Sequence, residues 1–177
     1  MSVGDRAGAL SGQFSQLLDY IAEKEAKTQS SYDNVHVIAF SFGTIVTLDA
    51  VFPYSTLSKR TRRINTLVTI GCPFDFIRTY WPTYFECRVG WPDVPHKWVN
   101  IYTPADVLGS DFKDEGSGVL RGVGMASTGE VCPTDNISCG RQIRLRDYSL
   151  PEKASLIGFK AHTGSSTAHR GLRTTAL

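Results

Sequence analysis

Two apolar runs in the middle of the chain predict neighbouring strands of a buried sheet. Residues 35–40 are nearly continuously apolar, as in a strand covered on both faces, and residues 64–70 are apolar and rich in β-branched side chains. Between them, apolar residues recur at helical spacing over residues 45–52, until Pro53 ends the pattern. Because a strand, a helix and a strand in one sheet form a parallel β-α-β unit, the sequence predicts the α/β class.

Weaker patterns place further elements on both sides of this unit. An apolar stripe predicts a helix over about residues 13–27, and residues 98–102 predict a third short strand. Residues 142–148 alternate apolar and charged side chains, which is typical of a half-exposed edge strand. A capping box at residues 149–152 then predicts a short helix to about residue 159.

Three segments lack a regular pattern. Residues 73–102 hold nine of the nineteen aromatic residues and four prolines, so we expect an irregular excursion over the strand ends, serving as a lid, a small core or a partner surface. Residues 109–140 hold seven glycines and predict a flexible or partly disordered flap. Residues 165–177 are small, polar and basic, which predicts a disordered tail after a single domain over residues 1–164.

Composition excludes several classes of function. The chain of 177 residues is 41% hydrophobic and 20% charged, as expected of a globular domain, and its net charge of +2 is too small to indicate nucleic acid or an anionic membrane as a partner. Since it has no long apolar run and no hydrophobic signal core, we expect a soluble cytoplasmic protein without a transmembrane segment. The four cysteines are expected to be thiols, and without a C-x-x-C motif or paired histidines we expect neither a metal nor another cofactor.

The chemistry that the sequence predicts centres on Ser41, where the first strand meets its helix. A serine hydroxyl is a poor nucleophile unless it is lifted toward a base, with the following backbone N–H, here that of Phe42, aimed at the developing oxyanion. A turn this sharp accepts only small residues two positions before and after the serine, and Ala39 and Gly43 meet that requirement. A plain strand-to-helix turn without a catalytic role is the alternative interpretation.

These residues resemble the nucleophile elbow of the α/β-hydrolase superfamily, G-x-S-x-G, with Ala39 in place of the first glycine. The superfamily orders its catalytic residues as serine, acid and histidine. The resemblance, which covers residues 35–164, therefore implies His162 as the base and Asp106, after the third strand, as the acid, with Asp75 as the main alternative acid. Cys72 is a minor alternative nucleophile, because no elbow-like turn surrounds it.

The resemblance implies a truncated α/β-hydrolase fold, with a mostly parallel sheet and flanking helices, and a serine hydrolase that acts on a carboxylic ester or related acyl bond of a small-molecule or lipid-like substrate. An acyltransferase with the same triad and a catalytically inactive interaction module are the alternatives. Only forty residues precede Ser41, so the upstream strands and the second oxyanion donor have no counterpart, and losing that donor would cost about 3 kcal/mol and weaken activity. The first strand would then lie at a sheet edge, which a second copy or a partner chain could cover.

Overall fold

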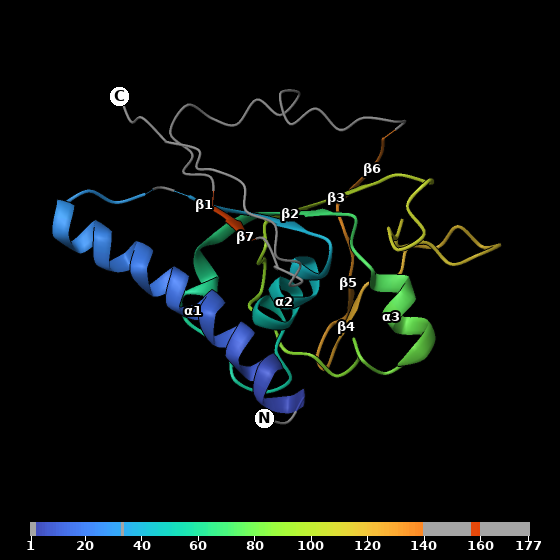
Figure 1. Ribbon diagram of the computed structural model, residues 1–177, viewed down its shortest axis with the longest axis horizontal. Coiled ribbons are helices and arrows are strands. Elements are labelled where there is room, and N and C mark those ends of the chain that lie inside the picture. The colour runs from blue at the N-terminus through green and yellow to red at the C-terminus, as the bar shows by residue number, and fades with distance from the viewer. Residues whose placement is uncertain (1–2, 33, 140–156, 160–177) are drawn as a thin grey trace, which may run out of the picture.

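The chain folds around a five-stranded sheet in which every neighbouring pair of strands is parallel (Figure 1). This computed structural model describes residues 3–32, 34–139 and 157–159, with side chains over residues 12–32 and 34–139. In sheet order, the strands are β6 (Asp135–Ser138), β3 (Lys97–Tyr102), β2 (Ile64–Ile70), β1 (Val35–Phe40) and β7 (Ile157–Phe159). The helices are α1 (Val3–Thr28), α2 (Phe42–Val51) and α3 (Phe74–Tyr80), with a 3-10 turn at Thr61–Arg63. The expected α/β class, a mostly parallel sheet with flanking helices, is confirmed.

The register of the sheet brings the ends of three strands level. Phe40 at the end of β1 pairs with Ile70 at the end of β2, and Ile70 pairs with Ile101 in β3. Because the strands are parallel, the loops that follow them all leave from one edge of the sheet, which we call the carboxyl edge. Residues far apart in the sequence, such as Ser41 and Asp106, therefore lie at the same edge.

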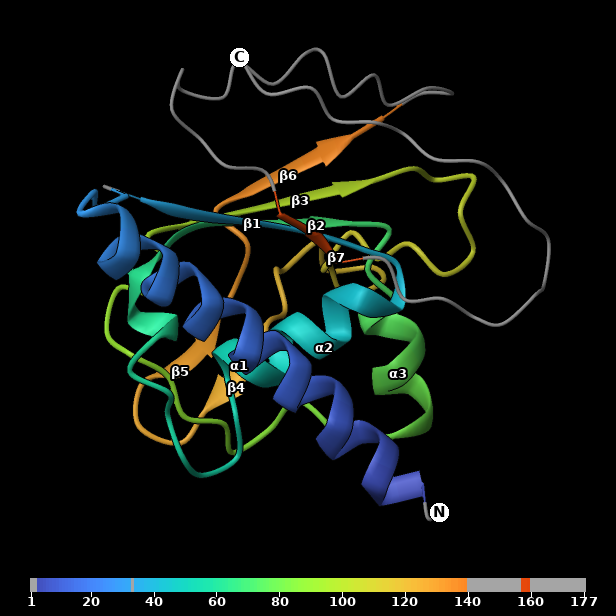
Figure 2. The ribbon, with the colours of Figure 1, turned by 60° about the vertical axis from the view of Figure 1, so that its left-hand side comes forward.

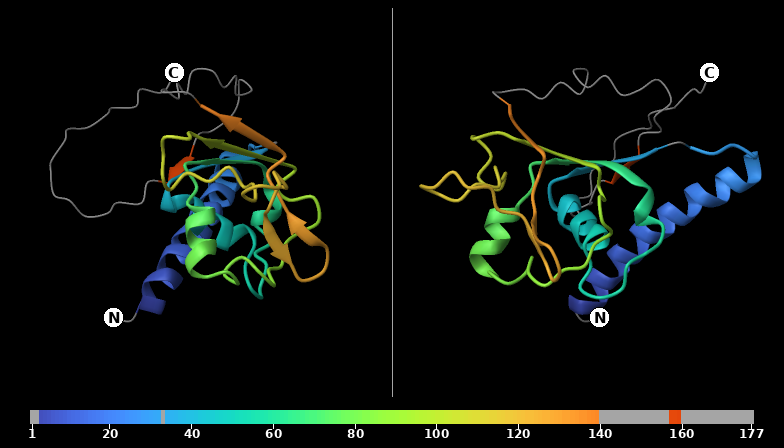
Figure 3. Two further views of the ribbon diagram at one scale, coloured as in Figure 1. Left: turned by 90° about the vertical axis from the view of Figure 1, so that its right-hand side faces the viewer. Right: turned by 180° about the vertical axis from the view of Figure 1, so that it is seen from behind.

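The helices all cover one face of the sheet, together with a hairpin formed by β4 (Val123–Met125) and β5 (Gly129–Val131) (Figures 2 and 3). The main core lies between this layer and the sheet, where Trp98 and Leu48 are each 1% exposed. Val68 and Ile70 of β2 belong to a second, smaller buried cluster, and the alternation of side chains along a strand directs them to the opposite face from Leu67. The later residues of β2 and most of β3 are buried on both faces, whereas β1 alternates between buried side chains and the partly or fully exposed His36, Ile38 and Phe40.

Three segments differ from the sequence prediction. The first helix spans Val3–Thr28, longer than the expected 13–27, and the aromatic excursion contains the short helix α3, which ends just before Pro82. Residues 109–140 are not a structureless flap, because they hold the β4–β5 hairpin and β6. Strands of three or four residues contain too few alternating positions to be recognised in a sequence. β6 is a strand because it forms hydrogen bonds with β3, which is distant in the sequence.

The prediction that β1 is an edge strand is also wrong. Ile157–Phe159, expected at the end of a helix, instead forms β7 and pairs with Val37–Ala39. An apolar strand with an unpaired edge is a site for further pairing, and here the chain supplies the partner itself. The strand expected at 142–148, the capping box at 149–152 and the tail at 165–177 lie outside the described residues.

Over the part of the chain that the structure describes, no helix combines the length and the hydropathy that a membrane span requires.

Candidate functional site

Ser41 occupies a strained junction between β1 and α2. Its backbone has φ 52° and ψ −134°, a conformation that costs a non-glycine residue about 1–3 kcal/mol. The Ser41 N–H donates to the Ile70 carbonyl over 2.9 Å, and the Ser41 carbonyl accepts from both the N–H (2.9 Å) and the hydroxyl (2.6 Å) of Thr44. These bonds hold the junction from both sides and leave the serine side chain half-exposed.

The residues around Ser41 satisfy the requirements of a sharp turn. Ala39 and Gly43, two positions away on either side, are both buried, so the space around them is filled. Phe42 is the first residue of α2, where a backbone N–H has no intrahelical acceptor. Among the described residues, nothing accepts a hydrogen bond from this N–H, and α2 carries no acidic side chain in its first turn. The positive end of the helix dipole therefore remains available for an anion next to Ser41.

Asp106 lies in the turn after β3, with its carboxylate over the end of β2. Its Oδ1 accepts from the Leu108 N–H over 3.0 Å. Its Oδ2 lies so close to Gly71, the residue after β2, that a Cβ placed on that glycine would be 3.1 Å away. β2 is the neighbour of β1 in the sheet. The Asp106 carboxylate therefore lies over the end of the strand next to the one that Ser41 follows.

A buried polar network fixes the loop that carries Asp106. Asn100 in β3 donates to the Ser110 carbonyl over 2.8 Å and accepts from the Thr69 hydroxyl over 2.9 Å, and the Ser110 N–H donates to the Cys72 carbonyl over 2.8 Å. Asn100 and Thr69 are both fully buried. The loop is thus tied to β2 and β3 at its far end as well as at its start. The sequence signal for this network was Asn100, an amide side chain within the otherwise apolar segment 98–102, and sequence reasoning missed it.

His162 and His169 lie outside the described residues. His36 is the second residue of β1, and His96 immediately precedes β3, so both belong to the opposite edge of the sheet from Ser41. Within residues 12–32 and 34–139, no imidazole is therefore near the serine. The described chain nevertheless returns to this region, because β7 ends with Phe159 paired to Ala39.

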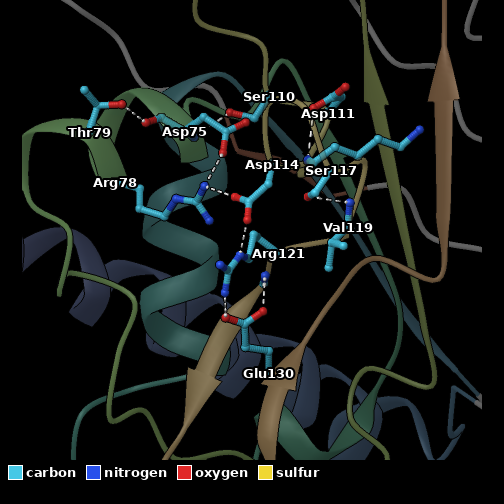
Figure 4. Close-up of polar contacts among 12 residues, drawn as sticks. Asp75, Arg78, Thr79, Ser110, Asp111, Asp114, Ser117, Val119, Arg121 and Glu130 are labelled. Atoms are coloured by element: carbon cyan, nitrogen blue, oxygen red, sulfur yellow. Dashed lines mark hydrogen bonds and ion pairs between the residues drawn. The ribbon is translucent and has the colours of Figure 1, made fainter.

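Asp75, the alternative acid, belongs to a cluster of charged side chains beside the sheet (Figure 4). It lies in the first turn of α3, with its N–H donating to the Ser110 hydroxyl over 2.6 Å and its Oδ1 4.0 Å from Arg78 Nη2. Arg78 in turn donates to Asp114 over 2.7 Å, and Arg121 donates to the other Asp114 oxygen over 2.7 Å.

Burial of Asp75 raises the pKa of its carboxyl group, and the nearby Arg78 opposes this shift. Among the described residues, Asp75 Oδ1 is buried without a hydrogen-bond partner. Over the same residues, no three His, Cys, Asp or Glu side chains are arranged to hold a metal ion.

Cys72 does not have the properties of a nucleophile. Its side chain is fully buried, and this burial raises the pKa of the thiol to about 12. Only the thiolate attacks efficiently, so Cys72 is inert at neutral pH. All four cysteines are free thiols, as the sequence predicted.

Exposed apolar side chains surround the carboxyl edge. Phe40 and Phe42 flank Ser41 and are 58% and 46% exposed, and Val107, which follows Asp106, is 98% exposed. On α3, Phe76 is 40% exposed. Sequence reasoning identified the aromatic segment after β2 but not the apolar residues on either side of the proposed nucleophile and acid.

Comparison of the chain with protein-family models, with curated proteins and with solved structures finds no match.

Proposed function

We propose that the protein is a serine hydrolase that cleaves a carboxylic ester or a related acyl bond. Ser41 is the nucleophile, His162 the base, and Asp106 the acid that orients His162. The observation that carries the proposal is the strained backbone of Ser41 at the carboxyl edge. A simple strand-to-helix turn does not require a non-glycine residue at φ 52°. Residues with a strained backbone cluster at active sites, which favours a catalytic role for Ser41.

In the proposed reaction, Ser41 Oγ attacks the acyl carbon while His162 accepts the serine proton. The Phe42 N–H, at the positive end of α2, stabilises the oxyanion. His162 then donates the proton to the leaving alcohol. In the second half of the reaction, a water molecule gives a proton to His162 and attacks the acyl carbon, and the Ser41 oxygen leaves with that proton, which releases the free acid. Because only one oxyanion donor is identified, we expect a kcat about 10²–10³-fold lower than that of a site with two donors.

Connectivity supports the assignment of the other two residues. Adjacent strands lie about 5 Å apart, so a carboxylate over the end of β2 is close enough to Ser41 for one imidazole ring to lie between them. Three peptide units separate Phe159 from His162, and covalent geometry limits their Cα atoms to about 11 Å. The Asp75 carboxylate faces Arg78 instead, which favours Asp106 as the acid.

The apolar surroundings of Ser41 favour an apolar acyl group as the substrate. Phe40, Phe42 and Val107 present unburied hydrocarbon surface at the mouth of the site, and covering it contributes about 25 cal/mol per Å². Along the chain, Ser41 follows β1, Asp106 follows β3 and His162 follows β7, and this order of serine, acid and histidine supports the likeness to a truncated α/β hydrolase.

Labelling with a fluorophosphonate, which reacts covalently with activated serines, tests the proposal. We expect the wild-type protein to be labelled, and Ser41→Ala to abolish labelling. Ser55→Ala, at an exposed serine in the loop after α2, is the matched control and should label like the wild type. His162→Ala and Asp106→Asn should each lower the labelling rate at least about a hundredfold, whereas Asp75→Asn should not.

Two outcomes would overturn the proposal: a folded wild-type protein that is never labelled, or labelling that survives Ser41→Ala. The first outcome would favour an interaction module. Tyr80 and Trp81, which are 64% and 61% exposed, are the aromatic side chains that would contact a partner. An acyltransferase is distinguished by adding an alcohol acceptor, because it forms a new ester where a hydrolase forms the free acid.

A further inference from the structure

A pocket lies between the C-terminal half of α1 and the start of β1, at the opposite edge of the sheet from Ser41. Its cavity measures about 210 Å³, and its apolar wall is formed by Leu17 and Ile21 of α1 and Val35 of β1. Val35 and Ser41 are six residues apart along an extended strand, a separation of about 20 Å. The pocket is therefore separate from the proposed catalytic site.

The cavity has the size of a small ligand. An apolar cavity of about 150 Å³ holds a benzene molecule, so about 210 Å³ accommodates one aromatic ring or short branched chain with a few further atoms. Ile21 is 9% exposed and Val35 8% exposed, so the wall of the pocket is part of the folded core. Tyr20, which also lines the pocket, is 54% exposed.

The polar side of the pocket includes two hydrogen-bond donors, Lys24 and Asn34. Lys24 lines it, with its ammonium 5.4 Å from the centre of the Tyr20 ring, and among the described residues it forms no ion pair. Asn34 also lines it, and because its Oδ1 accepts from Asn65 over 2.6 Å, its amide N–H₂ is the group left to donate. A lysine ammonium can only donate, so a ligand that contacts Lys24 directly must offer an acceptor atom.

Tyr32, which lines the pocket, is held in place by contacts within the protein. The Tyr32 N–H donates to Glu25 Oε1 over 2.7 Å, and Arg63 donates two bonds of 2.6 Å to the same carboxylate. The hydrogen bond from Arg63, followed by that from the Tyr32 backbone, lowers the pKa of Glu25 to about 2. Glu25 is therefore ionised and paired with Arg63, and no carboxylate of the described residues forms an ion pair with Lys24. A preformed pocket loses little entropy when a ligand binds.

From these observations we propose that the pocket between α1 and β1 binds a small amphipathic carboxylate. The ring or branched chain packs on Leu17, Ile21 and Val35, and the carboxylate accepts hydrogen bonds from Lys24 and Asn34. This assignment is independent of the proposed hydrolase activity, since no residue of the pocket belongs to the carboxyl edge.

An NMR titration of the ¹⁵N-labelled 177-residue chain with phenylacetate tests the proposal. We expect saturable shifts confined to the amides around Ile21, Lys24 and Val35. Benzyl alcohol, which has the same ring and no charge, should shift the same amides with weaker affinity. Absence of saturation, or shifts spread evenly over the surface, would overturn the assignment.

Three variants locate the ligand. Lys24→Gln should weaken phenylacetate binding roughly threefold to fivefold and leave benzyl alcohol unchanged. Lys27→Gln, one turn further along α1 and paired with Glu23 over 3.9 Å, is the matched control and should change neither. Leu17→Trp, at a half-exposed position of the wall, should fill the cavity and abolish both titrations. Equal effects of the two lysine variants, or undiminished binding by a folded Leu17→Trp protein, would each contradict the proposal.

Discussion

Removing the carboxylate charge of Asp49 should destabilise the fold far more than removing a surface carboxylate. Arg88 is 1% exposed, and its Nη1 donates to Asp49 Oδ1 over 2.8 Å. The same guanidinium donates to the carbonyls of Phe52 and Tyr84 and stacks on Tyr54, 3.8 Å from the ring centre. All of these other partners are neutral, so Asp49 is the only negative charge that the described residues place against this buried cation.

The expected magnitude follows from what Asp49→Asn leaves behind. Asparagine keeps the shape and an acceptor oxygen, so the change removes the charge and leaves a buried, unpaired cation, which costs about 3–5 kcal/mol. Because the Asp49 side chain is 25% exposed, water replaces part of the lost interaction, and we expect the lower value of about 3 kcal/mol. With a urea m value of about 2 kcal/mol/M, the unfolding midpoint should fall by about 1.5 M.

Two control variants make this test specific for the buried charge. Asp19→Asn breaks an ion pair with Arg60 in which both side chains are at least half-exposed, so it should cost less than about 0.5 kcal/mol. Tyr84→Phe removes only the 2.6 Å hydrogen bond to Asp49 Oδ2 and should cost about 1 kcal/mol. If Asp49→Asn costs no more than Asp19→Asn in urea unfolding, the buried pair does not stabilise the fold as we describe.

Three further predictions concern backbone strain and pH. Gly71→Ala should lower the unfolding free energy by about 1–3 kcal/mol, because Gly71 has φ +58° and the new Cβ would lie 3.1 Å from a carboxylate oxygen of Asp106. Gly12→Ala, whose new Cβ would have no atom within 4 Å, should raise the unfolding free energy by about 0.5–1 kcal/mol. Thermal unfolding of both variants checks this contrast. Ser41→Gly should stabilise the protein by about 1 kcal/mol relative to Ser41→Ala, since glycine adopts φ 52° freely; a less stable Ser41→Gly protein would contradict the strained junction. Hydrogen bonding to Arg63 lowers the pKa of Glu25 from 4.5 to about 2. The ionised Glu25 carboxylate therefore stabilises the fold above pH 4.5, and this contribution is lost as the pH falls toward 2. The difference in unfolding free energy between wild type and Glu25→Gln should shrink over this pH window, and a constant difference would refute the assignment.

The sequence alone identified the elements that depend on long or repetitive local patterns. β1, α2 and β2 are each six residues or longer, and the two strands are mostly apolar, so each carries enough local pattern to be recognised. β4, β5, β6 and β7 have three or four residues each, so they carry almost no periodicity and were missed or assigned to other structures. Their hydrogen bonds come from strands that are distant in the sequence, which no local pattern reports.

For the candidate site, the sequence by itself determined that a serine ends a buried strand between two small residues, because the chemistry of a sharp turn is local. Tertiary structure decided which groups share an edge of the sheet with that serine. The parallel register brings the turn after β3 over the end of β2, so Asp106 lies against Gly71 beside the strand of Ser41, while Asp75 faces Arg78. These relations depend on strand order and on the packing of loops separated by thirty residues or more, and they exist only once the sheet has formed.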